Sequence, residues 1–309
     1  CQLFALSSNS PSAVTFSFTG FSARGGRTGH HADGFGLAFH DGKRCRLFVD
    51  DAPACDSPLA EFLRQHPIRA RTVRGPIRQA TQGKVQLSSC HPFVREWQGR
   101  HWSFCHNGNL EGFAPRLSKG GFLPVGDTDS ERAFCYLLQE LRRRFGRRLA
   151  RGNEGSAWRE MAPVLAELAA GISAHGPFNF LLSDGEALYA YGATRLHWLT
   201  RQHPFAHAQL VDSEMSLDLA TVNAPGDRMV LVATEPLTSN ETWQAFAPGE
   251  LQVFVAGEQV WVHQAQTAYP SCLPAPAAQL LRQPCTVHRP LAGLLARADA
   301  LVPALGLSA

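Results

Sequence analysis

The sequence predicts an α+β protein built from two antiparallel sheets with helices packed outside them. Segments with strand character occur in pairs, and each pair is joined by a glycine-containing dipeptide typical of a tight hairpin turn. These dipeptides are Asp41-Gly42, Asp184-Gly185 and Gly257-Glu258. Between the pairs lie segments whose apolar residues recur at the spacing of a helix. Because hairpins join antiparallel strands, this order disfavours a doubly wound parallel sheet.

The expected strands are short apolar or alternating runs bounded by turn residues. The first of them, residues 2–6, is apolar, and Cys1 directly precedes it. In chain order, strands are expected at residues 2–6, 33–50 (a hairpin), 68–75, 101–108, 178–192 (a hairpin), 229–237 and 251–264 (a hairpin).

Three helices are expected between the strands. A short one covers residues 57–65, where Ser57 opens the segment and Glu61 follows soon after. A longer one starts near Asp129 or Ser130 and runs to residue 145, because apolar side chains recur there at helical spacing. Those side chains are Phe134, Leu137, Leu138 and Leu141. A third helix is expected from Trp158 to Ala170.

The composition is that of an ordinary globular protein. Of the 309 residues, 44% are hydrophobic and 18% are charged, and the formal net charge is only +3. Such a small charge gives no reason to expect a nucleic-acid partner. No apolar run approaches the roughly 20 residues of a membrane span, and no secretory signal pattern opens the sequence. We therefore expect a cytoplasmic protein that binds neither nucleic acid nor membrane.

One domain is expected over residues 1–268, because no change in composition divides this stretch and no repeat occurs. A proline-rich tail, residues 269–309, is expected to pack on its surface. The eight cysteines form no C-x-x-C pair, which indicates scattered reduced thiols and no zinc site. Their even number keeps a secreted disulfide framework open as the alternative.

Cys1 stands at the first position, with no methionine before it. One interpretation is a trimmed end of no chemical importance. The other is catalytic, because such a residue carries both a thiol nucleophile and a free α-amine. That amine titrates at about 7.7–8.0, so it can accept a proton from the thiol near neutral pH.

Later in the sequence, four other residues have side chains or backbone groups that suit the binding and cleavage of an amide substrate. The Asn107 side chain and the Gly108 N–H can both donate to a developing oxyanion. The planar fork of Arg78 suits a carboxylate, and Asp129 suits an ammonium group. Together they point to glutamine or a γ-glutamyl group. Taken singly, the same residues also suit a turn, a surface charge and a helix cap.

These features resemble the class II glutamine amidotransferase domain of the N-terminal-nucleophile hydrolase superfamily, especially its small stand-alone bacterial members. The matching motifs are Cys1, Arg24-Gly25, DGFG at 33–36, IRQAT at 77–81, CHPF at 90–93, HNG at 106–108 and TDSE at 128–131. Weaker matches extend to about residue 240. The resemblance implies a four-layer αββα sandwich.

The resemblance also implies catalytic roles. Cys1 corresponds to the nucleophile, with its own α-amine as proton acceptor, and Asn107 and Gly108 correspond to the oxyanion hole. In the implied mechanism, the Cys1 thiol attacks the γ-carbonyl of the substrate. Ammonia leaves, a γ-glutamyl thioester forms on Cys1, and water hydrolyses this thioester to glutamate. It requires no metal or organic cofactor.

Further roles concern the substrate pocket. Arg78 corresponds to the residue that binds the α-carboxylate of glutamine, and Asp129 to the one that binds its α-amine. Thr81 corresponds to a pocket-lining threonine and Arg24 to a supporting arginine near the nucleophile. His91 is interpreted as structural.

The sequence departs from the better-known synthases in two respects. Gln79 and Gln82 stand where those enzymes often have Trp and His, which removes two contacts near the glutamine site. No synthase domain is recognisable after residue 240. Three hypotheses follow: a glutaminase that passes ammonia to a partner protein, a γ-glutamyl amidohydrolase acting on a larger conjugate, and a catalytically silent scaffold. The intact catalytic positions disfavour the third.

Two weaker features have ordinary explanations. His30, His31 and Asp33 carry metal-ligating groups, but their glycine-rich loop favours polar packing, so no metal is expected. The basic run RRRFGRR at 142–148 suits an acidic partner or RNA, yet the small net charge favours a solvated helix end.

Overall fold

A computed structural model describes residues 1–81, 85–146 and 156–264. Residues 1–266 form one compact unit, to which the following description applies. The tail expected at 269–309 lies outside the described residues. Within the described part of the chain, each helix is too short or too polar to cross a bilayer.

The first sheet has seven antiparallel strands in the order β13-β9-β12-β1-β4-β2-β3. The strand β1 lies at its centre, paired on one side with β4 and on the other with β12. The strands are β1 Gln2–Ala13, β2 Phe35–Asp41, β3 Arg44–Asp50, β4 Arg69–Ile77, β9 His197–Gln202, β12 Arg228–Ala233 and β13 Gln244–Ala245.

The second sheet has six antiparallel strands in the order β15-β14-β8-β7-β6-β5. Its strands are β5 Phe93–Trp97, β6 Arg100–Gly108, β7 Phe178–Ser183, β8 Ala187–Gly192, β14 Glu250–Val255 and β15 Glu258–His263. A separate small hairpin pairs β10 His207–Gln209 with β11 Ser216–Asp218.

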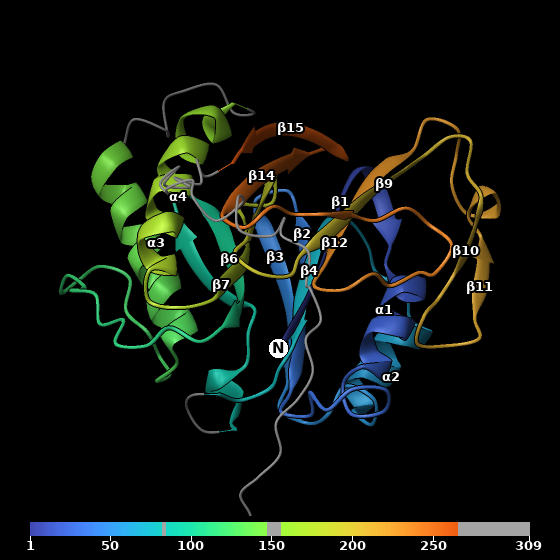
Figure 1. Cartoon of the computed structure of the whole chain (residues 1–309), viewed down its shortest axis with the longest axis horizontal. Helices are drawn as coiled ribbons and strands as arrows, with labels where there is room; N and C mark the ends of the chain where they lie inside the picture. The colour runs from blue at the N-terminus through green and yellow to red at the C-terminus, as the bar shows by residue number, and fades with distance from the viewer. Residues whose placement is uncertain (82–84, 147–155, 265–309) are drawn as a thin grey trace, which may run out of the picture. The chain divides into compact units, whose positions relative to one another are not determined.

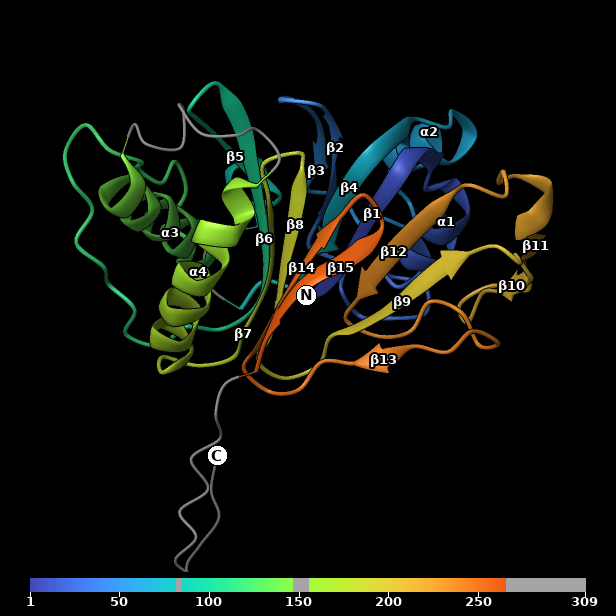
Figure 2. The same ribbon diagram turned by 90° about the horizontal axis from the view of Figure 1, so that it is seen from above.

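In the described part of the chain, four α-helices flank the two sheets (Figure 1). They are α1 Thr15–Ala23, α2 Pro58–Gln65, α3 Asp129–Phe145 and α4 Ala157–Ser173. Figure 2 shows α3 and α4 on one outer face and α1 and α2 on the other. The arrangement is a four-layer αββα sandwich, so the predicted fold class is confirmed.

Three apolar cores hold the layers together. One lies between α1, α2 and the first sheet, and includes Phe18, Phe21 and Leu63. The largest lies between α3, α4 and the second sheet. The third lies between the sheets, where Leu3 of β1 packs in the same cluster as Leu181 of β7. Because burying a large apolar side chain contributes about 1.5–3 kcal/mol, these layers are strongly coupled.

Most predicted elements occur within a few residues of their expected ends. Two hairpin turns differ by one residue from their expected positions. The turn of the first hairpin follows Asp41, which still pairs within β2, and the turn of the last hairpin precedes Glu258, which already begins β15. The helix α1 was not predicted, because its sequence TFSFTGFSA contains β-branched, aromatic and glycine residues of low helix propensity. Six of its nine residues are buried, so tertiary packing stabilises this helix.

The strands β2 and β4 approach so closely that Gly75 has no room for a side chain. A Cβ at this position would lie 1.9 Å from the Gly36 carbonyl oxygen. We predict that Gly75→Ala lowers the free energy of unfolding by about 1–3 kcal/mol in urea titrations, since the strands must separate.

The matched control is Gly171→Ala in α4, where a Cβ meets nothing within 4 Å. This change should raise the free energy of unfolding by about 0.5–1 kcal/mol, because glycine is unfavourable inside a helix. Equal effects of the two changes would contradict the proposed crowding at Gly75.

Candidate active site

Cys1 immediately precedes Gln2, the first residue of β1, which is the central strand of the first sheet. The register pairs Gln2 with Ile77, which brings Cys1 beside Arg78 and Gln79 at the end of β4. The Gln79 N–H donates to Cys1 Sγ at 3.4 Å, and the thiol lies 3.4 Å from the Gln79 carbonyl oxygen. Backbone contacts therefore hold the sulfur in place.

The α-amine of Cys1 is buried, and this lowers its pKa from 8.0 to about 6 because burial disfavours the cation. The Asp33 carboxylate acts in the opposite direction, and the Arg78 cation adds to the lowering. The amine is therefore mostly neutral at pH 7. A neutral amine beside a thiol can accept the thiol proton.

His91 presents its ring to the same sulfur, with Nε2 4.0 Å from Cys1 Sγ. The backbone N–H of His106 donates to Nδ1 of His91 at 3.3 Å, so Nδ1 carries no proton. Burial lowers the pKa of His91 well below its usual value, and the ring is neutral. Its proton therefore resides on Nε2, the nitrogen that faces the sulfur.

Asn107, at the end of β6, reaches Cys1 from the second sheet. Its side-chain amide donates to the Cys1 carbonyl oxygen. The fully buried Asn179 of β7 donates to Asn107 Oδ1 at 3.1 Å, which orients the Asn107 amide nitrogen toward Cys1. Asn179 is itself held by the backbone N–H groups of Ala193 and Thr194, each at 2.9 Å.

Gly108 follows Asn107 and must remain a glycine. Its φ is +149°, and a Cβ would lie 1.8 Å from the Pro177 carbonyl oxygen. The close approach of these two backbones brings the end of β6 against the start of β7. Gly108 lines two cavities that it shares with Cys1.

The smaller of these cavities, about 20 Å³, joins Cys1 to Arg78 and Asp129. Both charged residues are at least nine-tenths buried. Arg78 donates to the Asp33 carbonyl oxygen at 3.4 Å. Asp129, the first residue of α3, accepts from the backbone N–H of Leu110 at 2.8 Å. A cation and an anion thus line the same small cavity as the thiol.

The larger cavity, about 600 Å³, shares Cys1, Gln79, Thr81 and Gly108 with the smaller one. Most of its lining residues have polar side chains, and these include Thr28, His30, His31, Thr194, Arg195 and Glu235. Thr81 is exposed and lies where the two cavities meet. The thiol stands between a confined charged site and a roomier polar one.

A model of the class-II glutamine amidotransferases matches residues 1–275 of the sequence. The chain belongs to this family. It is 45% identical over 260 residues to YafJ of Escherichia coli (strain K12), which covers 84% of this chain and 99% of that protein.

Solved structures agree with the assignment. The amidotransferase superimposes on the crystal structure of a predicted glutamine amidotransferase from Pseudomonas aeruginosa PA01 with a TM-score of 0.65 and 37% identity. That match covers 84% of this chain and 100% of the other. Glutamine phosphoribosylpyrophosphate amidotransferase from B. subtilis matches with a TM-score of 0.52 and 13% identity. This match covers 82% of the present chain and 47% of the B. subtilis chain. At that identity the likeness shows the fold alone.

Arg24 of the amidotransferase contacts the strand β1 next to Cys1. Its guanidinium donates to Asp212 Oδ2 at 2.6 Å and to the Pro236 carbonyl oxygen at 2.6 Å. It also donates to Gln2 Oε1, at 3.1 Å, directly beside Cys1. Arg24 thus ties α1, β1 and the segment after β12 together.

The two weaker sequence features have structural explanations. The rings of His30 and His31 stack with their centroids 4.6 Å apart. Among the described residues, no group of three or more His, Cys, Asp or Glu side chains is arranged to hold a metal. In the basic run, Arg143 pairs with Glu140 and Arg144 with Glu167, whereas residues 147–148 lie outside the described part.

Sequence reasoning did not find Asn179 or the contact of His91 with the sulfur. The available signal for Asn179 was a polar amide within the apolar run FNFLL, where an unsatisfied side chain is costly. For His91 the sequence held no such signal, since its contact joins two distant segments.

The cysteines of the amidotransferase should differ sharply in reactivity. Burial raises the pKa of Cys45, Cys90 and Cys135 to about 11, so these thiols stay protonated near neutral pH. We predict that a glutamine analogue with a diazoketone group adds once, to Cys1, as measured by intact mass and peptide mapping.

The control is Cys1→Ser, which should remain unlabelled, and excess glutamine should slow the reaction of the unchanged protein. Labelling of Cys45 or another thiol in its place would remove the case for Cys1 as the nucleophile.

Proposed function

We propose that this amidotransferase hydrolyses the γ-amide of glutamine at Cys1 and releases glutamate and ammonia. The observation that carries the proposal is the cavity shared by the Cys1 thiol, Arg78 and Asp129. A carboxylate, an ammonium and an amide on one substrate match these three groups in charge and chemistry.

In the binding step, the Arg78 fork takes the α-carboxylate and Asp129 takes the α-ammonium group. The cavity of about 20 Å³ has room for about one water, so a glutamyl group needs the walls to move apart. Residues 79–81 form part of this wall and lie outside any strand or helix. We infer that this segment shifts when substrate enters.

In the acylation step, the neutral α-amine takes the thiol proton, directly or through a water, and the sulfur attacks the γ-carbonyl carbon. The oxyanion accepts hydrogen bonds from the Asn107 amide and the Gly108 N–H. The His91 Nε2–H faces the sulfur and favours the thiolate during this transfer.

Collapse of the tetrahedral intermediate breaks the carbon–nitrogen bond. The protonated amine of Cys1 gives its proton to the leaving nitrogen, and ammonia departs. Water, deprotonated by the same amine, then attacks the γ-glutamyl thioester, and cleavage of the carbon–sulfur bond yields glutamate and the free thiol. In this scheme the released ammonia passes to a partner protein that aminates an acceptor.

A second candidate function is hydrolysis of a larger γ-glutamyl conjugate. The cavity of about 600 Å³ beside Cys1 supports it, because ammonia alone needs far less room. Its polar walls, with Thr28, Thr194 and Arg195, suit an amine leaving group that carries further polar substituents.

The α-amine base leads to a prediction for the pH dependence. The base must be unprotonated, so kcat/KM for glutamine should rise with pH through an inflection near 6, the lowered pKa of the Cys1 amine. An ordinary α-amine would place the inflection near 8.0. Circular dichroism at each pH serves as the control for unfolding, and an inflection near 8.0 would contradict the buried base.

The two candidate functions are separated by an assay of glutamate release from glutamine and from a panel of γ-glutamyl compounds with larger amines. We expect the highest kcat/KM for glutamine. A conjugate preferred by about tenfold or more, worth about 1.4 kcal/mol in transition-state binding, would establish the second candidate. No glutamate from any compound would overturn both.

Arg78→Lys provides the matched variant in this assay. It keeps the positive charge but loses the planar fork, so KM should rise by about tenfold or more for every γ-glutamyl compound. An unchanged KM would show that Arg78 does not hold the carboxylate.

A further inference from the structure

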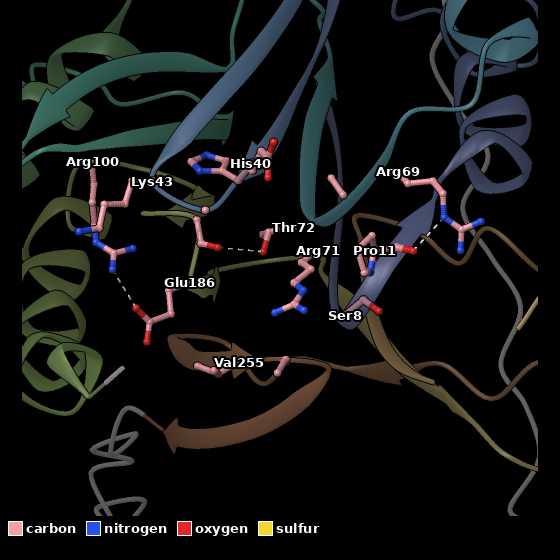
Figure 3. Close-up of a pocket in the computed structure, with 15 residues that line it drawn as sticks. Ser8, Pro11, His40, Lys43, Arg69, Arg71, Thr72, Arg100, Glu186 and Val255 are labelled. Carbon is pink, nitrogen blue, oxygen red and sulfur yellow. Dashed lines mark hydrogen bonds and ion pairs between the residues drawn. The ribbon is translucent and has the colours of Figure 1, made fainter. Parts of the chain in front are cut away.

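Figure 3 shows a third cavity, of about 580 Å³. It lies at the opposite end of the two sheets from Cys1, since Arg69 and Arg71 begin β4 whereas Cys1 lies beside its last residues. It is lined by the β2–β3 turn, the start of β4, the start of β6 and the β7–β8 turn. Seven residue steps along β4 separate Arg71, in this cavity, from Arg78, so the two sites lie about 23 Å apart. The cavity is therefore separate from the candidate active site.

Positive charge dominates the walls. Four cations, Lys43, Arg69, Arg71 and Arg100, line the cavity with two carboxylates, Asp41 and Glu186. Arg69 donates to the Pro11 carbonyl oxygen at 3.1 Å, and Arg100 pairs with Glu186 at 3.2 Å. These contacts orient two cations on different walls.

Arg71 differs from the other cations, because it makes no hydrogen bond or ion pair with any described residue. Its guanidinium extends into the space between Thr72 and Val255 in Figure 3. A guanidinium has five N–H donors, and its fork matches the geometry of a phosphate or carboxylate.

Buried donors without partners lie behind the same wall. Arg74 is completely buried and forms no ion pair with a described residue, and its Nε and Nη2 have no hydrogen-bond partner there. Burial lowers the pKa of Arg74 to about 10, so it stays cationic at neutral pH. An uncompensated buried cation is costly, and a nearby anion offsets that cost.

His40 links this cation to the cavity. Arg74 Nη1 lies 3.3 Å from His40 Nε2, and because a guanidinium only donates, Nε2 accepts. Burial lowers the pKa of His40 well below its usual value, so the neutral ring carries its proton on Nδ1. That donor is buried without a partner in the described chain, and it faces Gly185 in the cavity wall.

We propose that this cavity binds a small anion bearing phosphate groups, such as inorganic pyrophosphate or a phosphate ester. Arg71 is the principal ligand, and Lys43 and Arg100 approach from the facing wall. A tetrahedral phosphate accepts hydrogen bonds from several directions at once, which suits cations on opposite walls better than one planar carboxylate does. The volume falls within the range of small-molecule sites.

Calorimetric titration with inorganic pyrophosphate tests the proposal at an ionic strength of about 150 mM, where weak surface attraction is screened. We expect saturable binding and a rise in Tm, because a ligand that binds only the folded state stabilises it. Arg71→Gln should weaken pyrophosphate binding by about tenfold or more, the effect of losing charged hydrogen bonds.

The matched control is Arg143→Gln, which removes an exposed arginine of α3 outside the cavity and should leave the affinity unchanged. Glutamate release by Arg71→Gln should equal that of the unchanged protein, so failure here and failure of the proposed glutaminase are distinguishable. Absence of saturable binding, equal weakening by both variants, or equal affinity for citrate would overturn the proposal.

Discussion

The pairing of β1 on both edges is the constraint on which the candidate site depends. The first residue of a chain is ordinarily free to move, but here Gln2 pairs with Ile77 of β4 and the Leu3 N–H donates to Thr234 Oγ1 at 2.8 Å. Cys1 is therefore fixed relative to Arg78 by a ladder of backbone hydrogen bonds. Moving β1 by one residue would exchange the side chains that face the helices with those that face the second sheet, and it would carry the thiol away.

The second requirement is the packing of one sheet on the other. Asn107 and Gly108 belong to β6, whereas Cys1 and Arg78 belong to the first sheet or its strand ends. The apolar layer between the sheets sets their separation. Asn179 completes the arrangement, because it orients the Asn107 amide across this junction.

Burial of polar groups has opposite consequences at the two ends of the sandwich. Near Cys1, burial keeps the α-amine neutral, and the His91 ring is held by a backbone donor. At the other end, burial encloses the Arg74 cation with donors that lack partners. In the two proposals, the same low-dielectric interior favours proton transfer at one site and attraction of an anion at the other.

The sequence by itself determined the family, three hairpins and the residue types of the candidate site. Turn dipeptides such as Asp184-Gly185 and the helix start at Asp129 are local signals, because a few adjacent residues decide their backbone angles. The roles given to Arg78, Asn107 and Asp129 remain predictions. The helix α1 was not predicted, because its residues have low helix propensity and its stability comes from burial against the rest of the protein.

Only the tertiary structure decided which distant residues meet. The contact of His91 with the sulfur, the orientation of Asn107 by Asn179, and the two cavities beside Cys1 all join segments from different strands and sheets. The pKa of the amine likewise follows from burial by those segments. A sequence records the chemistry of each side chain, whereas distance, desolvation and enclosed space arise only when the sheets pack together.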